Sequence, residues 1–309
     1  MDGQDLKSCI DASTRLLLDF RKSVRTGENV ARLSIICETL YDPESEVMPQ
    51  KVDLLTIVGW GMLLMPLLTM WHEIGGHAAL CVVQGGHVTT IGAFYVDCAG
   101  LTDFPNVVVA CAGVFVNAVL AVVAYRLWRG ARTDNLRLVL WLVWVSEAFV
   151  AAGYFCFSGV TGFGDLGTGT GGSLQMLPMP IAIRGAELLI GVVAYISLVR
   201  AAIGSLDTML GTGPDTRTAR RRIAHGYYAT AGIGAVLVGL MNPVGIVITI
   251  MSAAASSFGG LAGFISIGFA GRREGTAAAF VINRNWPVVC LGAVVLLAFS
   301  VVLGPSRHF

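Results

Sequence analysis

Charged residues are scarce in this sequence. They make up 13% of its 309 residues, against roughly 25% in a typical soluble domain, whereas 55% of the residues are hydrophobic. Most of the charge lies in residues 1–51 and in a few short clusters, which long apolar stretches separate. A helix needs about 20 apolar residues to cross a bilayer core of roughly 30 Å. The deficit of charge therefore excludes an ordinary soluble domain and indicates an integral membrane protein.

A basic surface and an export signal are also missing. The formal net charge is +1, and the sequence has no basic stripe of the kind that binds nucleic acid. A mixed, charged segment of about 50 residues precedes the first apolar stretch, whereas a signal peptide begins with a short basic region. We therefore expect the lipid bilayer as a partner, and neither nucleic acid nor a cleaved leader.

Cysteines at metal-binding spacing are absent. None of the seven cysteines is spaced as CxxC, and most lie inside apolar stretches. Such cysteines behave as small apolar residues. We therefore interpret all of them as small buried packing residues rather than as metal ligands or disulfide partners: Cys9, Cys37, Cys81, Cys98, Cys111, Cys156 and Cys290.

Residues 1–50 predict a short helical cap. Leu16, Phe20 and Val24 recur at helical spacing among charged residues, which is the pattern of an amphipathic helix. A second apolar pattern follows it before the first long apolar stretch. We expect a cytoplasmic helical hairpin on the membrane surface, and a membrane-embedded domain at 51–309.

The apolar stretches predict an all-α, polytopic helical membrane protein with about six to seven transmembrane segments. Pro243 lacks an N–H and disfavours helix in the residue before it, so it interrupts the fifth segment. The segments lie at about 52–83, 106–125, 138–157 and 181–199, from about 226 to 242, from there to about 270, and at about 287–303.

Arginine is distributed unevenly among the connecting loops. The loops at 126–137 and 200–222 hold four and five arginines, whereas those at 84–105 and 159–180 hold neither lysine nor arginine. Because positively charged loops stay in the cytoplasm, this alternation predicts a cytoplasmic N-terminus and a plasma or inner membrane location. The two loops without lysine or arginine then lie on the opposite side of the membrane. They carry Asp97, Asp103 and Asp165.

Histidine is scarce as well, yet two of the five histidines lie close together near the end of the first apolar stretch. The segment 71–78 reads WHEIGGHA. Ionisable groups at membrane depth are costly and therefore indicate function. The zinc-peptidase motif HExxH places two imidazoles on one helix face and a glutamate beside the metal-bound water. Hence His72, Glu73 and His77 predict a related site.

The spacing differs from that motif by one residue. His72 and His77 are five residues apart, so on a regular α-helix they would point about 140° apart. One π-turn would absorb the extra residue and bring both rings to one face, and Gly75 and Gly76 make such unwinding easy. In the alternative pairing, Glu73 and His77 share a face of a regular helix.

Three further elements follow the histidine motif in a characteristic order. GGHV at 85–88 forms a glycine-rich turn, AGVFVN at 112–117 opens the next span, and GD at 164–165 follows the third. With the histidine motif, they make the chain resemble the site-2-protease-like membrane zinc metallopeptidases, in particular a bacterial branch of that family. The resemblance covers roughly residues 65–170, and a weaker similarity is found at 242–243.

The resemblance implies a chemistry. His72, His77 and Asp165 would hold a zinc ion, leaving a fourth position for water, and Glu73 would act as general base on that water. The implied protein is an intramembrane zinc endopeptidase. Its substrate would be a transmembrane helix of another membrane protein, hydrolysed at a peptide bond in or near the membrane.

A substrate helix must unwind locally before its backbone can be hydrolysed. The interruption at 242–243 and the small residues at 252–260 either line the place where this happens or only kink and pack helices.

If Asp165 is not the third metal ligand, the alternatives are Asp97, Asp103 and Glu147.

Other polar residues have structural interpretations as well as functional ones. Glu147, in the middle of a span, either supports the site or forms an interhelical hydrogen bond, and Asn117 is expected to bond across helices. We expect His87 to be a solvated loop residue. Arg184 and Glu187, three residues apart, predict a structural ion pair.

Two other classes of function compete with the peptidase. A non-catalytic membrane scaffold of the same fold, which binds other membrane segments, is favoured by the altered histidine spacing. A transporter also uses broken helices and buried acids, but the sequence has no internal repeat to support it. Metal content distinguishes the peptidase from the scaffold.

Overall fold

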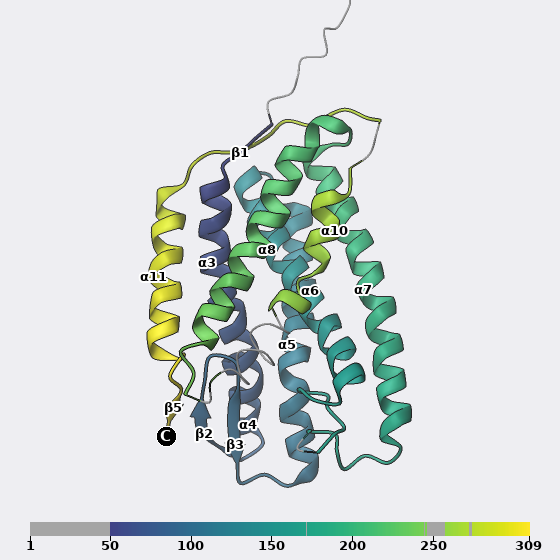
Figure 1. Cartoon of the computed structure of the whole chain (residues 1–309), viewed down its shortest axis with the longest axis vertical. Helices are drawn as coiled ribbons and strands as arrows, with labels where there is room; N and C mark the ends of the chain where they lie inside the picture. The colour runs from purple at the N-terminus through teal and green to yellow at the C-terminus, as the bar shows by residue number, and fades with distance from the viewer. Residues whose placement is uncertain (1–49, 171, 244, 246–256, 272–273) are drawn as a thin grey trace, which may run out of the picture. The chain divides into compact units, whose positions relative to one another are not determined.

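The computed structural model describes residues 50–309 except 171, 244, 246–256 and 272–273. The predicted cap at 1–50 therefore lies outside the described residues, apart from its last position. The described part is mostly helical, as the sequence predicts, and Figure 1 shows its long helices side by side. The helices are α3 (Leu54–Met70), the π-helix η1 (Trp71–Ala78), α4 (Ala79–Val83), α5 (Asp103–Gly130), α6 (Asp134–Thr161), α7 (Pro180–Leu210), the short 3₁₀-helix η2 (Pro214–Thr216), α8 (Arg217–Gly239), α10 (Gly263–Phe269) and α11 (Trp286–Val302).

Four helical stretches in the described part are long and apolar enough to cross a membrane. They match the first four predicted segments, and the first of them runs without a break through α3, η1 and α4. Helix α7 is the most exposed, since only 17% of its apolar window is buried. Ile181 and Leu189 on α7 are 85% and 67% exposed. Apolar surface of this extent indicates contact with an apolar environment.

The later segments differ from the prediction. The fifth corresponds to α8, which begins earlier than predicted and ends at Gly239, just before Asn242 and Pro243. The last two correspond to shorter apolar helices, Ser257–Phe269 and α11. Helices that are both long and apolar enough to span a membrane therefore number four among the described residues, against six to seven predicted segments.

Two small sheets, which the all-α prediction did not include, lie at opposite ends of the helices (Figure 1). At one end, β1 (Gln50–Val52) pairs in parallel with β4 (Phe280–Ile282). At the other, β2 (His87–Ile91) pairs antiparallel with β3 (Val96–Ala99) and β5 (Arg307–His308). The strand order is β3-β2-β5, so β3 is an edge strand. Strands β2 and β3 lie in the segment 84–105, for which the sequence predicted only a loop.

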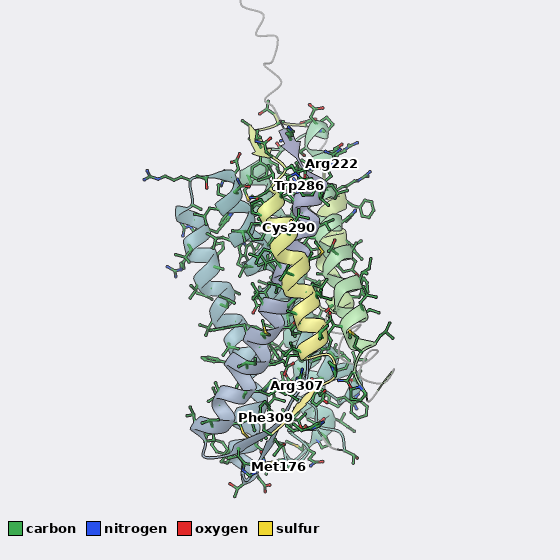
Figure 2. The ribbon with its side chains drawn as sticks, turned by 90° about the vertical axis from the view of Figure 1, so that its left-hand side faces the viewer. Met176, Arg222, Trp286, Cys290, Arg307 and Phe309 are labelled. Carbon is green, nitrogen blue, oxygen red and sulfur yellow. A yellow bond between two sulfur atoms is a disulfide. The ribbon has the colours of Figure 1, made fainter. Side chains whose placement is uncertain are left out.

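The helices pack in a fixed pattern. Helix α6 packs against α5 and α7, and α3 packs against α8 and α11. Large buried side chains from α6, α8 and α10, namely Trp141, Phe149, Tyr227 and Phe264, form the centre of the core. Arg222 and Trp286 lie toward one end of the helices and Met176, Arg307 and Phe309 toward the other (Figure 2).

The interpretation of the cysteines is wrong for one pair. Cys81 of α4 and Cys98 of β3 form a disulfide. The β2–β3 hairpin folds back on the end of α4 and brings these residues together across a sequence separation of 17. No CxxC spacing signals such a pair, because the contact depends on the hairpin. Cys111, Cys156 and Cys290 are free, as predicted, but the prediction that they are buried is wrong: Cys111 and Cys156 are half-buried and Cys290 is exposed.

The predicted ion pair between Arg184 and Glu187 is also wrong. Arg184 donates instead to the carbonyl oxygens of Gly159, at 3.0 Å, and Val160, at the end of α6. The last carbonyls of a helix have no intrahelical donor and attract a cation. Neither oxygen of the buried Glu187 carboxylate has a hydrogen-bond partner in the described part of the chain.

Candidate metal centre

The segment that carries both histidines is a π-helix. Residues Trp71–Ala78 form η1, between the α-helical turns of α3 and α4. A π-turn takes up one residue more than an α-turn, so residues five apart return to the same face. The hypothesis that the extra glycine is absorbed by a π-turn is confirmed. Regular helix, which the pairing of Glu73 with His77 requires, is absent at 72–77.

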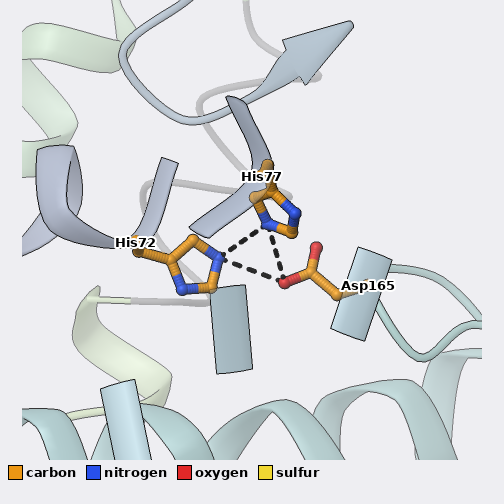
Figure 3. A group of neighbouring side chains, drawn as sticks. All are labelled: His72, His77 and Asp165. Carbon is orange, nitrogen blue, oxygen red and sulfur yellow. Dashed lines mark hydrogen bonds and ion pairs between the residues drawn. The ribbon is translucent and has the colours of Figure 1, made fainter. Parts of the chain in front are cut away.

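The wider turn brings the two imidazoles together. Nε2 of His72 lies 3.1 Å from Nε2 of His77, and both nitrogens face the Asp165 carboxylate, at 3.1 Å from His72 and 3.3 Å from His77 (Figure 3). Both histidines are buried, and the Asp165 side chain is 20% exposed. These three residues form the group, among the described residues, that could hold a metal ion.

A glycine-rich loop after α6 delivers Asp165 to the cluster. Gly162 ends α6 in the left-handed conformation (φ 77°), which glycine adopts without strain. Gly169 N–H donates to the Gly162 carbonyl at 2.8 Å, and Gly167 N–H donates to the Gly164 carbonyl at 2.9 Å. These bonds close the loop on itself. The backbone therefore fixes the aspartate opposite the π-helix.

The outer nitrogen of each imidazole is also engaged. Nδ1 of His77 donates to the Val109 carbonyl at 2.8 Å. Nδ1 of His72 donates to the side-chain oxygen of Asn117 at 3.0 Å, with the Asn117 amide oriented to satisfy all its neighbours. When Nδ1 carries the proton of a neutral imidazole, Nε2 presents a lone pair. Both histidines therefore offer a lone pair to the same point.

A positive charge is needed to hold these groups together. Two Nε2 lone pairs and a carboxylate oxygen would otherwise repel one another at 3.1–3.3 Å. Three ligands bound at 2.0–2.1 Å around a tetrahedral ion lie about 3.3 Å apart. The residues therefore fit a metal ion in both donor chemistry and spacing.

Glu73 lies beside the cluster without belonging to it. Its side chain is 5% exposed, and its Oε2 has no hydrogen-bond partner among the described residues. It lines both cavities that reach the cluster. A buried carboxylate oxygen without a donor is costly, and a metal-bound water would satisfy it.

Two cavities reach the cluster from different directions. An apolar cavity of about 300 Å³ touches His72, Glu73 and Asp165. Its wall is formed mostly by apolar side chains, including Met65, Leu68, Phe94, Val150, Phe157 and Leu261. Tyr154 also lines it and stacks on the His72 ring, with ring centroids 5.0 Å apart.

The second cavity, which we call the vestibule, is polar and has a volume of about 510 Å³. It touches Glu73, His77 and Asp165 and lies against the edge strand β3. Polar residues from the hairpin, the start of α5 and the loop before α7 line it, including Tyr95, Asp97, Asp103, Asn106 and Ser173. The metal-binding group thus has an apolar side and a water-accessible side.

The structure brings the predicted residues together and leaves the alternatives apart. Asp97 and Asp103, proposed as alternative ligands, lie in the vestibule outside the metal-binding group. Glu147 is not in that group either. With the Asn117 amide in the orientation that its neighbours satisfy, Glu147 accepts from Asn117 at 3.1 Å, which is the bond across helices expected for Asn117 and one of the two interpretations of Glu147. His87 is exposed, as expected, but it is the first residue of β2 rather than a loop residue.

Two contacts of the site were not foreseen from the sequence. Tyr154 has no motif around it, and only the packing of α6 beside the first span places it on His72. Gly113 lies so close to both imidazoles that a Cβ there would be 2.5 Å from each Nε2. The glycine of the AGVFVN element could have indicated the second contact, because a glycine allows another element to approach the backbone closely.

No known protein family, curated protein or solved structure matches the chain. Its function must therefore be inferred from its residues and their geometry.

Proposed function

We propose that the chain is an intramembrane zinc endopeptidase of the site-2-protease-like kind. The observation that carries this proposal is the convergence of His72, His77 and Asp165 on one point, with the buried Glu73 carboxylate beside them. Two imidazoles and one carboxylate leave a fourth position free, which is the ligand pattern of catalytic rather than structural zinc sites.

We further propose that the chain lies in a plasma or inner membrane with several spans and a cytoplasmic N-terminus. Four apolar helices of spanning length support it, as does the apolar surface of α7. The arginine-rich loops then face the cytoplasm, and the β2–β3 hairpin faces the other side. The disulfide between Cys81 and Cys98 agrees with this orientation, because disulfides persist in oxidising compartments outside the cytoplasm.

Zinc is the metal that the donors favour. Two imidazole nitrogens, which are ligands of borderline softness, and one carboxylate suit Zn²⁺. Mg²⁺ and Ca²⁺ prefer sites made of oxygen ligands alone. When bound, zinc supplies an acidified water molecule and polarises a peptide carbonyl. Val109 and Asn117 hold the imidazoles in the tautomer that this binding requires.

Glu73 is the proposed general base. Its Oε2 accepts a proton from the attacking water and passes it to the leaving amine nitrogen of the substrate. The carboxylate is held in a buried position where both cavities meet, so that substrate and water reach it from different sides. No hydrogen-bond donor of the described residues reaches this oxygen.

The substrate class follows from the two cavities. The apolar cavity accommodates apolar side chains of a membrane segment, and the vestibule supplies water and receives the unwound, polar end. The free edge of β3 borders the vestibule and offers main-chain groups to an extended peptide. We therefore propose substrates that are transmembrane helices of other membrane proteins, cleaved near the non-cytoplasmic boundary.

The full chain, purified in lipid nanodiscs, tests the proposal. Elemental analysis should find one zinc ion per chain, and end-labelled synthetic transmembrane peptides with helix-breaking residues near one boundary should be cleaved. The matched control is Glu73→Gln, which should keep zinc and lose cleavage. A wild-type protein without zinc would overturn the proposal. Bound zinc without cleavage of any peptide in the set would favour the non-catalytic scaffold instead.

A further inference from the structure

Asn117 of α5 joins the metal centre to a buried carboxylate that the proposed reaction does not use. When its amide is turned to the orientation that all its neighbours can satisfy, its side-chain oxygen accepts from His72 Nδ1 at 3.0 Å. Its side-chain nitrogen donates to Glu147 Oε2 at 3.1 Å and to the Gly113 carbonyl at 3.2 Å. Asn117 and Glu147 are 1% and 2% exposed. The three side chains thus form a buried relay from α6 through α5 to the π-helix.

An asparagine amide can be reversed at little steric cost, because its oxygen and its nitrogen are similar in size. In one orientation the oxygen faces His72 and accepts the Nδ1 proton. In the other, the NH₂ group faces His72 and favours the tautomer with the proton on Nε2, which cannot bind a metal through that nitrogen. Something must therefore determine which way the amide of Asn117 points.

Glu147 and the Gly113 carbonyl are that determinant. Both are acceptors and both lie on the same side of the Asn117 amide, so the NH₂ group has to point toward them. The Gly113 carbonyl alone satisfies one of the two N–H groups, and Glu147 satisfies the other. A buried carboxyl group on a membrane-spanning helix is costly to keep, and this cost indicates a role.

We propose that Glu147 is a positioning residue for the metal centre, acting through Asn117 to hold His72 in its metal-binding tautomer. The inference rests on the proposed zinc site. Glu147 lines the apolar cavity but lies outside the metal-binding group, and its proposed effect is on metal affinity. The requirement is for an acceptor at this position and not for a negative charge. Glutamine, which can present its carbonyl oxygen to Asn117, should therefore replace it, whereas leucine should not.

Zinc affinity of the full chain, measured by competition with a chelating dye, tests this. Glu147→Leu should bind zinc about 10–100-fold more weakly than wild type, the usual loss when an outer-shell partner of a ligand is removed. Glu147→Gln should remain within about 3-fold of wild type. The matched control is Glu187→Leu, which removes another buried glutamate outside the relay and should leave affinity unchanged.

A double mutant keeps the test sharp if Glu147→Leu folds poorly. Asn117→Asp presents an oxygen to His72 in either orientation of its side chain. A hydrogen-bond acceptor at position 147 is then no longer needed to orient that side chain. The double variant Asn117→Asp with Glu147→Leu should recover zinc affinity to within about 10-fold of wild type. The optical spectrum of the Co²⁺-substituted protein should follow the same order, because it reports ligand geometry.

Each outcome has a distinct meaning. If wild type binds no zinc, the proposed function fails and the relay fails with it. If wild type binds zinc and Glu147→Leu binds it equally well, only the relay is overturned. If Glu147→Gln is as weak as Glu147→Leu, the charge of Glu147 matters rather than its acceptor, and the tautomer mechanism is wrong.

Discussion

Gly76 of η1 and Gly113 of α5 pack backbone against backbone. A Cβ on Gly76 would lie 2.7 Å from the Gly113 α-carbon, and a Cβ on Gly113 would lie 2.5 Å from Nε2 of both His72 and His77. Helix α5 can therefore approach the π-helix closely only because neither position has a side chain. The same closeness places the Val109 carbonyl and Asn117 within reach of the imidazoles.

Replacing Gly113 with alanine should abolish metal binding. The new methyl group would occupy the point on which the two Nε2 atoms converge, and the imidazoles would have to turn away from each other. We expect zinc content to fall below about one tenth of the wild-type value, which corresponds to a loss of more than about 1.4 kcal/mol in binding free energy. Gly130→Ala on the same helix is the control, because no atom lies within 4 Å of a Cβ there. Normal zinc content in Gly113→Ala would place the metal elsewhere.

Asp165→Ala should remove the zinc, whereas Asp97→Ala and Asp103→Ala should retain it. Only Asp165 has a carboxylate oxygen near both Nε2 atoms, while the other two aspartates lie in the vestibule. Zinc content by elemental analysis distinguishes the three variants. Full zinc in Asp165→Ala, with loss in either of the others, would transfer the third ligand to the hairpin or to the start of α5.

The histidine motif could be predicted from the sequence because it depends on local geometry. The spacing of His72 and His77 is incompatible with a regular helix, and two glycines lie between them, so a π-turn was the local solution that brings both rings to one face. Asp165 is 88 residues beyond His77, and no local rule connects them. It could be predicted only through the resemblance to a family, together with its glycine-rich surroundings.

The contacts that the sequence did not reveal depend on packing between distant elements. The Cys81–Cys98 disulfide requires the β2–β3 hairpin, whose strands lie in a segment that was expected to be a loop. The relay from Asn117 to Glu147 requires the relative rotation of α5 and α6. The amphipathic pattern of an apolar helix is weak, because every side faces either lipid or protein, so the buried face cannot be read from the sequence.

Removing the disulfide should destabilise the protein without unfolding the metal centre. Cys81 and Cys98 close a loop with a sequence separation of 17, and a bond across a loop of that length stabilises by about 3 kcal/mol in the chain-entropy account. Cys81→Ser should lower the melting temperature in detergent, whereas Cys290→Ser, at an exposed free cysteine, should not. Equal melting temperatures for the two variants would show that the bond does not form in the purified protein.

Acid should weaken the start of the first span through Asp53. Burial acts to raise the pKa of Asp53, but hydrogen bonds from Arg284 and Thr56 outweigh it and hold the pKa below its ordinary value of 3.8. Because the folded pKa lies below the unfolded one, this stabilisation is present above about pH 4 and is lost as the pH falls further.

Two substitutions separate the charge of Asp53 from its cap. Asp53 accepts from Thr56 N–H at 3.0 Å as the N-cap of α3, and from Arg284 at 3.0 Å. Asp53→Ala should cost about 1 kcal/mol at neutral pH, whereas Asp53→Asn, which still caps, should cost less. Both should flatten the dependence of the melting temperature on pH below about 4. An unchanged acid dependence in Asp53→Asn would assign it to another carboxylate.

Deletion of Gly76 tests whether the π-turn exists to align the ligands. The deletion converts the motif to HEIGH, in which the two histidines are four residues apart and point only about 40° apart on a regular helix. The π-turn then has no residue to absorb, and Gly75 takes the place of the lost glycine against Gly113. Zinc affinity should be equal to that of wild type or higher, because the ligands converge without a π-turn.

The control for the deletion is removal of Ala79, which leaves the motif intact and rotates α4 by about 100°. That variant should keep zinc and lose the Cys81–Cys98 disulfide, since Cys81 would turn away from the hairpin. The Gly76 deletion should keep both, because loss of the π-turn compensates for the missing residue and leaves the orientation of α4 unchanged. Loss of zinc in the Gly76 deletion would mean that Glu73 and His77, which are three residues apart after the deletion, are the pair that binds the metal. The convergence of His72 and His77 would then have another cause.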